Sequence, residues 1–252
     1  MSLFEDLIED RDEDEKIIKS FESKEELSNN IFEKNKDDYK MRDDVRKALL
    51  KIADEFIESL GVEFFIHDIV LTGSLANYNW SNFSDVDLHV LIDYKESKYN
   101  SDILKEFFDA KKNVWNEKHD ILIKGFDVEL YVQDIEEQHI SSGVYSVLNN
   151  KWLLKPKQEK PKIDDRMILQ KGEEYMKKID LLISKSKKGV DVLNEIEKLR
   201  KKLKTFRQCG LDKGGEYSYE NLTFKLLRRN GYIEKLLKLK TSLTDKKLSI
   251  TQ

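Results

Sequence analysis

The sequence contains one cysteine, two prolines and no long apolar segment among its 252 residues. The single cysteine, Cys209, excludes an intramolecular disulfide framework and is typical of a reducing compartment. No apolar segment reaches the length of about 20 residues that a membrane-spanning helix requires. Residues 1–15 are acidic and lack the basic and then apolar pattern of a signal peptide. We therefore expect a soluble, cytoplasmic protein with no membrane partner.

Charged side chains are abundant and unevenly distributed. They make up 37% of the chain, against about a quarter in an average domain. Residues 1–150 are acidic, whereas residues 151–252 contain 27 basic and 14 acidic side chains. This basic half indicates either solvated, lysine-rich helix faces or attraction for a polyanion such as RNA or a nucleoside triphosphate. Composition alone leaves both interpretations open.

Patterns along the chain predict three parts. Residues 1–40 are polar and acidic, so we expect an arm that is partly disordered. Residues 41–155 mix helical and strand patterns and form the predicted core. Both prolines lie in the segment KPKQEKPK, which indicates a domain boundary. Residues 156–252 show the apolar spacing of helices, interrupted by a predicted glycine-rich loop, CGLDKGGEYS.

The core is predicted to alternate between helices and strands. The expected elements are a helix at residues 43–60, a strand region at 62–72, a strand at 85–93, a helix at 101–117 and two strands within 120–132. Residues 134–165 show no clear period and are predicted to form a connector. This order places acidic residues on two separate strands.

Asp85 and Asp87 lie two residues apart in one predicted strand. Side chains two apart point to the same face of a strand, so both carboxylates share a face with His89. Adjacent carboxylates repel each other, and a divalent cation, usually Mg²⁺, would keep the pair ionised. Glu129 can supply a third carboxylate if its strand pairs beside the first. The alternative, that Glu129 is an ordinary surface charge, remains open.

Gly73 and Ser74 lie between the predicted strand region at 62–72 and the predicted strand at 85–93. Glycine lets the backbone approach phosphate oxygens closely, and a serine hydroxyl can donate to them. By contrast, His67 shows no metal-ligand spacing, and Asp93 is interpreted as a strand-end residue. Both are expected to be structural.

The ordered combination of these motifs resembles the DNA polymerase β-like nucleotidyltransferase superfamily. The matching segments are Gly73-Ser74, SDVDLHV at 84–90 and GFDVELYV at 125–132. The chain is also similar to small nucleotidyltransferases encoded by bacteriophages. The resemblance covers about residues 43–133 and implies an α/β (α+β) core, with a mixed sheet flanked by helices, plus a helical C-terminal domain.

The resemblance also implies an activity and the residues that perform it. It identifies Asp85, Asp87 and Glu129 as catalytic and metal-binding, although the superfamily more often has Asp at the third position. The implied reaction, of EC 2.7.7 type, moves a nucleoside monophosphate from an NTP, first of all ATP, to an acceptor hydroxyl and releases pyrophosphate. The implied cofactor is two Mg²⁺ ions, with Mn²⁺ as an alternative. The nucleotide-binding candidates are Gly73, Ser74, Tyr145, Lys178 and Lys225.

The acceptor is not written in the sequence. The basic half favours the 3′-hydroxyl of RNA. The alternatives are a small molecule, such as an antibiotic, and a protein side chain. A hypothesis of another class is a non-catalytic protein that binds or senses a nucleotide.

Overall fold

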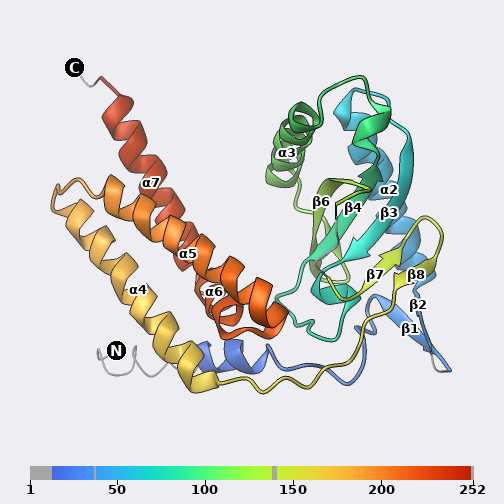
Figure 1. Ribbon diagram of the computed structural model, residues 1–252, viewed down its shortest axis with the longest axis horizontal. Coiled ribbons are helices and arrows are strands. Elements are labelled where there is room, and N and C mark those ends of the chain that lie inside the picture. The colour runs from blue at the N-terminus through green and yellow to red at the C-terminus, as the bar shows by residue number, and fades with distance from the viewer. Residues whose placement is uncertain (1–12, 37, 138–140, 251–252) are drawn as a thin grey trace. The chain divides into compact units, whose positions relative to one another are not determined.

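The computed structural model describes residues 13–36, 38–137 and 141–250, which form two compact units (Figure 1). The first unit is Ser23–Lys160 and contains the sheet. The second unit is helical and combines residues 13–22 with residues 161–250. Residues 13–19 of the predicted acidic arm are helical, whereas its residues 1–12 lie outside the described part of the chain.

A six-stranded sheet forms the centre of the first unit, with the strand order β5-β6-β4-β3-β7-β8. The strands are β3 (Ile66–Thr72), β4 (Val86–Ile92), β5 (Leu122–Ile123), β6 (Phe126–Asp134), β7 (Val144–Ser146) and β8 (Lys151–Leu154). β4 and β6 are parallel, whereas the other neighbouring strands are antiparallel. The sheet is therefore mixed, as the sequence predicts.

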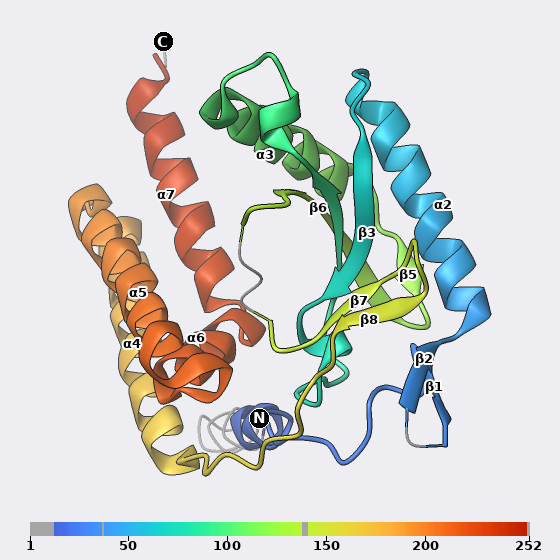
Figure 2. The same cartoon turned by 45° about the vertical axis from the view of Figure 1, so that its right-hand side comes forward.

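Two long helices, α2 (Asp43–Leu60) and α3 (Ser101–Lys118), flank this sheet (Figure 2). α2 forms because Leu49, Phe56 and other apolar residues recur on one face, which is buried. The helix ends at Gly61, whose φ of 71° is the left-handed conformation of a helix C-terminus. Phe56 and Phe108 of α3 belong to the same buried cluster as Leu88 of β4. The prediction of a mixed sheet flanked by helices is confirmed.

The core of the first unit lies on one face of the three central strands. Leu71 of β3, Leu88 of β4 and Leu130 of β6 are completely buried in it. Side chains alternate between the faces of a strand, so Asp87 and Glu129 point to the opposite face. There both are half-buried. One face of the sheet therefore holds the unit together, and the other presents its acidic residues.

Shorter strands complete the first unit. β1 (Phe32–Asn35) and β2 (Asp38–Met41) form a two-stranded antiparallel sheet. β7 and β8 lie within residues 134–165, so the prediction of a connector there is wrong for these two strands. Val144 and Tyr145 of β7 are buried, and Tyr145 pairs with Leu71 of β3. Three residues are too few to show a periodic pattern, which is why β7 escaped prediction.

Residues 161–250 of the second unit are helical, as predicted, and contain four α-helices. They are α4 (Asp165–Lys187), α5 (Leu193–Gly214), α6 (Tyr219–Arg229) and α7 (Tyr232–Leu248). Buried apolar side chains of these helices form one cluster, which also includes Ile17, Ile18 and Phe21. None of the helices within the described residues has the length and apolar composition needed to cross a membrane.

The predicted glycine-rich loop after Cys209 is instead mostly helical, because α5 continues to Gly214. Gly210 is buried in this last part of the helix. A Cβ atom added to Gly210 would lie 2.6 Å from the Cβ of Glu220 in α6. The glycine therefore allows α5 and the start of α6 to approach each other, and it does not mark a loop.

Candidate functional site

Asp87 and Glu129 lie directly beside each other on parallel strands. The register of β4 and β6 pairs Asp87 with Glu129. Neighbouring strands are about 4.8 Å apart, so the two backbones hold the carboxylates close on one face. Asp85 lies one residue before β4 and is also half-buried. The predicted pairing of the strand that carries Glu129 with the strand that carries Asp87 is therefore observed.

Gly73 brings the turn after β3 against the Asp87 carboxylate. The last residue of β3, Thr72, pairs with Asp87 across the sheet. Gly73 then adopts φ 72° and ψ −159°, a conformation that is essentially restricted to glycine. A Cβ atom at this position would lie 1.9 Å from Oδ2 of Asp87. The sequence therefore needs glycine here both for the backbone conformation and for the approach to the acid.

Ser74 connects this turn to the loop that precedes Asp85. It begins a single helical turn, η1 (Ser74–Ala76). The Ser74 hydroxyl donates a hydrogen bond of 2.8 Å to Oγ of Ser84, and Ser84 also accepts one of 2.9 Å from the backbone N–H of Ser81. The Gly-Ser turn and the start of β4 are thus held together by side-chain hydrogen bonds.

Tyr131 holds the carboxylate of Glu129. Its hydroxyl donates a hydrogen bond to Oε2 of Glu129. Burial raises the pKa of Tyr131 above its usual value, and the hydrogen bond to Glu129 and the charges of Glu129, Asp87 and Asp85 raise it further. The hydroxyl therefore stays protonated and able to donate, and all three acids act on it. Sequence reasoning missed Tyr131, although its position two residues after Glu129 places it on the same face.

The Tyr131 ring is itself held by its neighbours. It stacks on the ring of His89, with centroids 4.7 Å apart, and the ammonium of Lys112 lies 4.5 Å from its centroid. Nδ1 of His89 lies 2.7 Å from Oε1 of Gln133, at hydrogen-bonding distance. This arrangement supports the acidic residues through side chains of β4, β6 and α3.

Tyr145 was predicted to bind nucleotide, but it lies in the core of the sheet unit. It is 1% exposed. Its hydroxyl accepts a hydrogen bond from the backbone N–H of Met41 and donates one to Oδ1 of Asn150. Its ring packs edge-on against Phe32 and Trp152, with centroids 5.3 and 4.9 Å away. Because a base needs an accessible ring face for stacking, we correct this assignment and exclude Tyr145 from the nucleotide site.

Lys178 and Lys225, the two predicted lysines, belong to the helical unit. The ammonium of Lys178 binds Glu174 one turn earlier in α4 and lies 5.4 Å from the ring centroid of Tyr175. Lys225 of α6 is half-buried. Burial lowers its pKa to about 8, although Glu216 acts in the opposite direction. The structure thus groups Gly73, Ser74 and the three acids within the sheet unit and assigns both lysines to the other unit.

The acidic residues have the chemistry of a magnesium site. Carboxylate oxygens are the ligands that Mg²⁺ prefers, and one or two carboxylates together with substrate phosphates usually hold it. Asp87 and Glu129 supply such oxygens from two adjacent strands, Asp85 from the residue before β4, and the half-buried Gly73 turn lies next to Asp87. The residues present therefore fit a divalent cation.

Comparison with known proteins assigns a domain to this region. Residues 49–163 match the family model described as a nucleotidyltransferase domain, and this range includes Gly73, the acidic residues and all six strands of the larger sheet. Such a domain transfers a nucleoside monophosphate and takes an NTP as substrate. No curated protein and no solved structure matches the chain. The suggested similarity to bacteriophage enzymes stays a prediction.

Proposed function

We propose, from the premise of a nucleotidyltransferase domain, that this chain is an EC 2.7.7-type enzyme. It moves a nucleoside monophosphate from an NTP, with ATP as the first choice, to an acceptor hydroxyl and releases pyrophosphate. The observation that carries the proposal is the register of Asp87 with Glu129, next to the contact of Gly73 with Asp87. Such an arrangement suits phosphoryl chemistry because it places several oxygen ligands beside a turn that can approach phosphate.

The metal is proposed to bind to the three acids. Asp85 and Asp87 would hold the ions, and Glu129 would complete the set of ligands on the acceptor side. Two Mg²⁺ ions, or Mn²⁺ in their place, would stabilise charge on the triphosphate and lower the pKa of the acceptor hydroxyl.

The remaining residues are proposed to bind the phosphates and to orient the reacting groups. Gly73 and Ser74 bind the β- and γ-phosphates, and the hydrogen bond from Ser74 to Ser84 holds their turn in place. Glu129 accepts the proton of the acceptor hydroxyl, directly or through a water molecule. Tyr131 keeps the Glu129 carboxylate oriented by donating to one of its oxygens. Lys178 and Lys225 remain candidates for binding phosphate on the helical unit.

RNA is the proposed acceptor, because the second unit presents exposed basic side chains. Lys198, Lys201 and Lys202 of α5 are exposed and line a shallow groove with Thr205 and Phe206. Lysine ammonium groups bind phosphates, and an aromatic ring beside them can stack on a base. A small-molecule or protein hydroxyl is the alternative acceptor. A protein that only senses a nucleotide would not need Glu129 on the acceptor side.

Labelled nucleotide distinguishes these acceptors. We expect that incubating the full chain with α-³²P-labelled NTPs, Mg²⁺ and a cell extract transfers the label to material that ribonuclease degrades. Labelling should fall steeply between about 50 and 200 mM salt, because each phosphate contact releases counterions. Label in protein or small molecules instead would exclude RNA, and no transfer with any NTP would contradict the enzyme proposal.

The α5 lysines provide a matched test of the RNA surface. The triple change Lys198→Gln, Lys201→Gln and Lys202→Gln should weaken RNA binding and reduce its salt dependence. The control is Lys47→Gln, Lys51→Gln and Lys118→Gln, which removes three exposed lysines from α2 and α3 of the sheet unit. Equal RNA affinity of the triple variant and the control would exclude α5 as the RNA surface.

A further inference from the structure

A second group of metal-ligating side chains lies at the far end of β4 from the proposed active site. His67, Asp93 and Glu96 each offer a ligand atom, and these atoms all lie within 4.8 Å of one another. Asp93 follows the last residue of β4, six residues after Asp87. At about 3.3 Å per strand residue, the two positions are about 20 Å apart. The group is therefore separate from the acids of the nucleotidyltransferase site.

A β-bulge places His67 beside the other two residues. In the pairing of β3 with β4, Ile66 opposes Ile92 and Asp68 opposes Leu91, so His67 is the additional residue. A bulge redirects a side chain and is a common device next to functional sites. Nε2 of His67 lies 3.3 Å from Oε2 of Glu96.

Asp93 and Glu96 are positioned by one short turn. The Oδ1 atom of Asp93 accepts a hydrogen bond of 2.8 Å from the backbone N–H of Lys95 at the start of η2 (Tyr94–Glu96). This turn returns the chain toward β3, so that Glu96 reaches His67. The second carboxylate oxygen of Asp93 is not part of that backbone contact. The bulge in β3 and the turn after β4 thus bring together three side chains that can bind a metal ion.

The lysine that follows Asp93 in sequence makes its salt bridge elsewhere, although the charge of Asp93 also acts on it. The ammonium of Lys95 binds Glu136, and the ammonium of Lys98 lies 5.5 Å from the ring centroid of Tyr99. Two carboxylates held close together repel each other. A divalent cation relieves this repulsion more fully than a single imidazolium does, because it carries two charges and binds all three groups at once.

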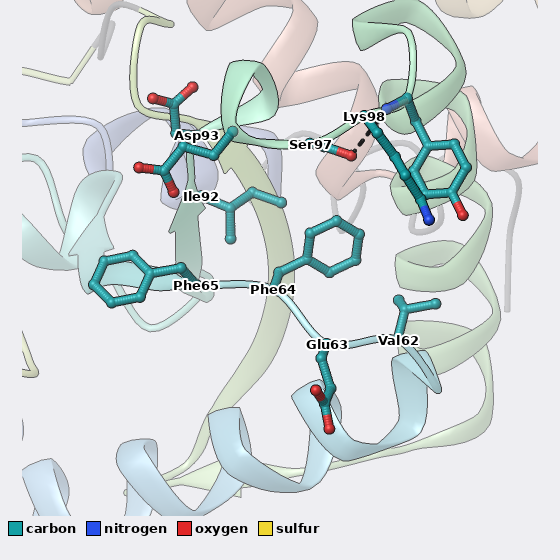
Figure 3. A pocket seen from close by; sticks show the side chains of 10 residues that line it. Val62, Glu63, Phe64, Phe65, Ile92, Asp93, Ser97 and Lys98 are labelled. Atoms are coloured by element: carbon teal, nitrogen blue, oxygen red, sulfur yellow. Dashed lines mark hydrogen bonds between the residues drawn. The ribbon is translucent and has the colours of Figure 1, made fainter.

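A pocket of about 500 Å³ opens next to two of these ligands (Figure 3). Asp93 and Glu96 line it together with the apolar side chains of Phe64 and Ile92. Figure 3 shows the Asp93 carboxylate beside Ile92, with the rings of Phe64 and Phe65 on the adjoining segment. Three protein ligands leave a coordination position for water or a bound molecule, and the pocket provides room for it.

We propose that His67, Asp93 and Glu96 bind one divalent transition-metal ion, Zn²⁺ in preference to Mg²⁺. An imidazole nitrogen is a ligand of zinc and other transition metals, whereas Mg²⁺ sites are built of oxygen. The ion joins the start of β3 to the turn after β4. It thereby holds one wall of the pocket in place.

Zinc titration of the full chain tests this site. The parent chain carries Asp85→Asn and Asp87→Asn, which weaken metal binding at the proposed active site. We expect the parent to bind one Zn²⁺ at micromolar concentration. Adding His67→Ala, or Glu96→Gln as a second variant, should weaken zinc binding at least as much as the loss of an outer-shell partner does, by about 10- to 100-fold or more, since each removes one of three ligands. His119→Ala is the matched control, because this exposed histidine lies outside the group.

Cobalt supplies an independent readout. Co²⁺ in place of zinc should give a visible absorption spectrum with the parent and the His119→Ala chain, and the His67→Ala chain should lose it. Circular dichroism establishes that each variant is folded. Equal zinc affinity of the parent and the His67→Ala chain would overturn the proposal, as would a parent that takes up no zinc at micromolar concentration.

Discussion

The Asp87→Asn chain is expected to fold normally and to transfer nucleotide at least about 10³-fold more slowly than the unchanged chain. The change keeps the size of the side chain but removes a charged metal ligand. Metal ions stabilise transition-state charge by several kcal/mol, and about 1.4 kcal/mol corresponds to each tenfold change in rate. Asp87 lies at the centre of the site, because Glu129 opposes it on β6 and Gly73 contacts its carboxylate.

The fold of this variant should change little. Asn keeps the size and the hydrogen-bonding oxygen of the half-buried Asp87 side chain, so we expect the free energy of unfolding to change by no more than about 1 to 2 kcal/mol. Urea unfolding measures this. The control is Asp54→Asn, the same change at an exposed acid of α2, which should leave transfer unaffected. A fully active Asp87→Asn chain would refute the proposed mechanism.

Gly73→Ala should damage both stability and transfer. Its backbone conformation costs a residue with a Cβ atom about 1 to 3 kcal/mol. In addition, the Cβ would lie 1.9 Å from Oδ2 of Asp87, so either the turn or the carboxylate must move. We expect the free energy of unfolding to fall by about 2 to 3 kcal/mol and transfer to fall about 100-fold or more, as for other misplaced catalytic groups.

Gly61→Ala separates these two effects. Gly61 also has a positive φ, of 71°, but a Cβ atom there would meet nothing within 4 Å. The control should therefore lose about 1 kcal/mol of stability from backbone strain alone and keep its transfer rate. Urea unfolding and labelled-nucleotide transfer are measured on both variants. If the Gly73→Ala chain transfers nucleotide as fast as the Gly61→Ala chain, the Gly73 turn has no part in the site.

The acidic strands could be predicted because their signals are local. Strand alternation assigned Asp87 and Glu129 to one face of their strands. It assigned the apolar residues that alternate with them in each strand to the core. The apolar spacing likewise gave the bounds of α2, which begins at Asp43 and ends at Leu60. These features depend on side chains only a few positions apart, so periodicity reveals them.

Tyr145 could not be placed correctly from sequence, because its surroundings come from distant parts of the chain. Met41 and Phe32 contact it from more than a hundred residues earlier. In the sequence, a tyrosine near the C-terminal end of the predicted core can either stack on a base or be buried. The pairing of β7 with β3 decides between these two roles. The environment of Lys225 could not be predicted from sequence for the same reason, because its lowered pKa depends on burial.

His67 and Asp93 illustrate a different limit. The sequence predicts a structural role for His67, which shows no metal-ligand spacing, and Asp93 is interpreted as a strand-end residue. The bulge in β3 and the turn after β4 bring them together with Glu96 across 29 residues of chain. Sequence spacing detects ligands on one element, whereas ligands from several elements become visible only when strand register is known.

The most direct test of the nucleotidyltransferase site compares Glu129→Gln with Asp127→Asn. Both residues belong to β6 and, two apart, share a face, but only Glu129 opposes Asp87. Pyrophosphate release is measured with NTPs, Mg²⁺ and an extract that contains the acceptor. We predict that the Asp127→Asn and unchanged chains release pyrophosphate at similar rates and that the Glu129→Gln chain is about 100-fold or more slower. Equal rates for the Glu129→Gln and unchanged chains would contradict the account.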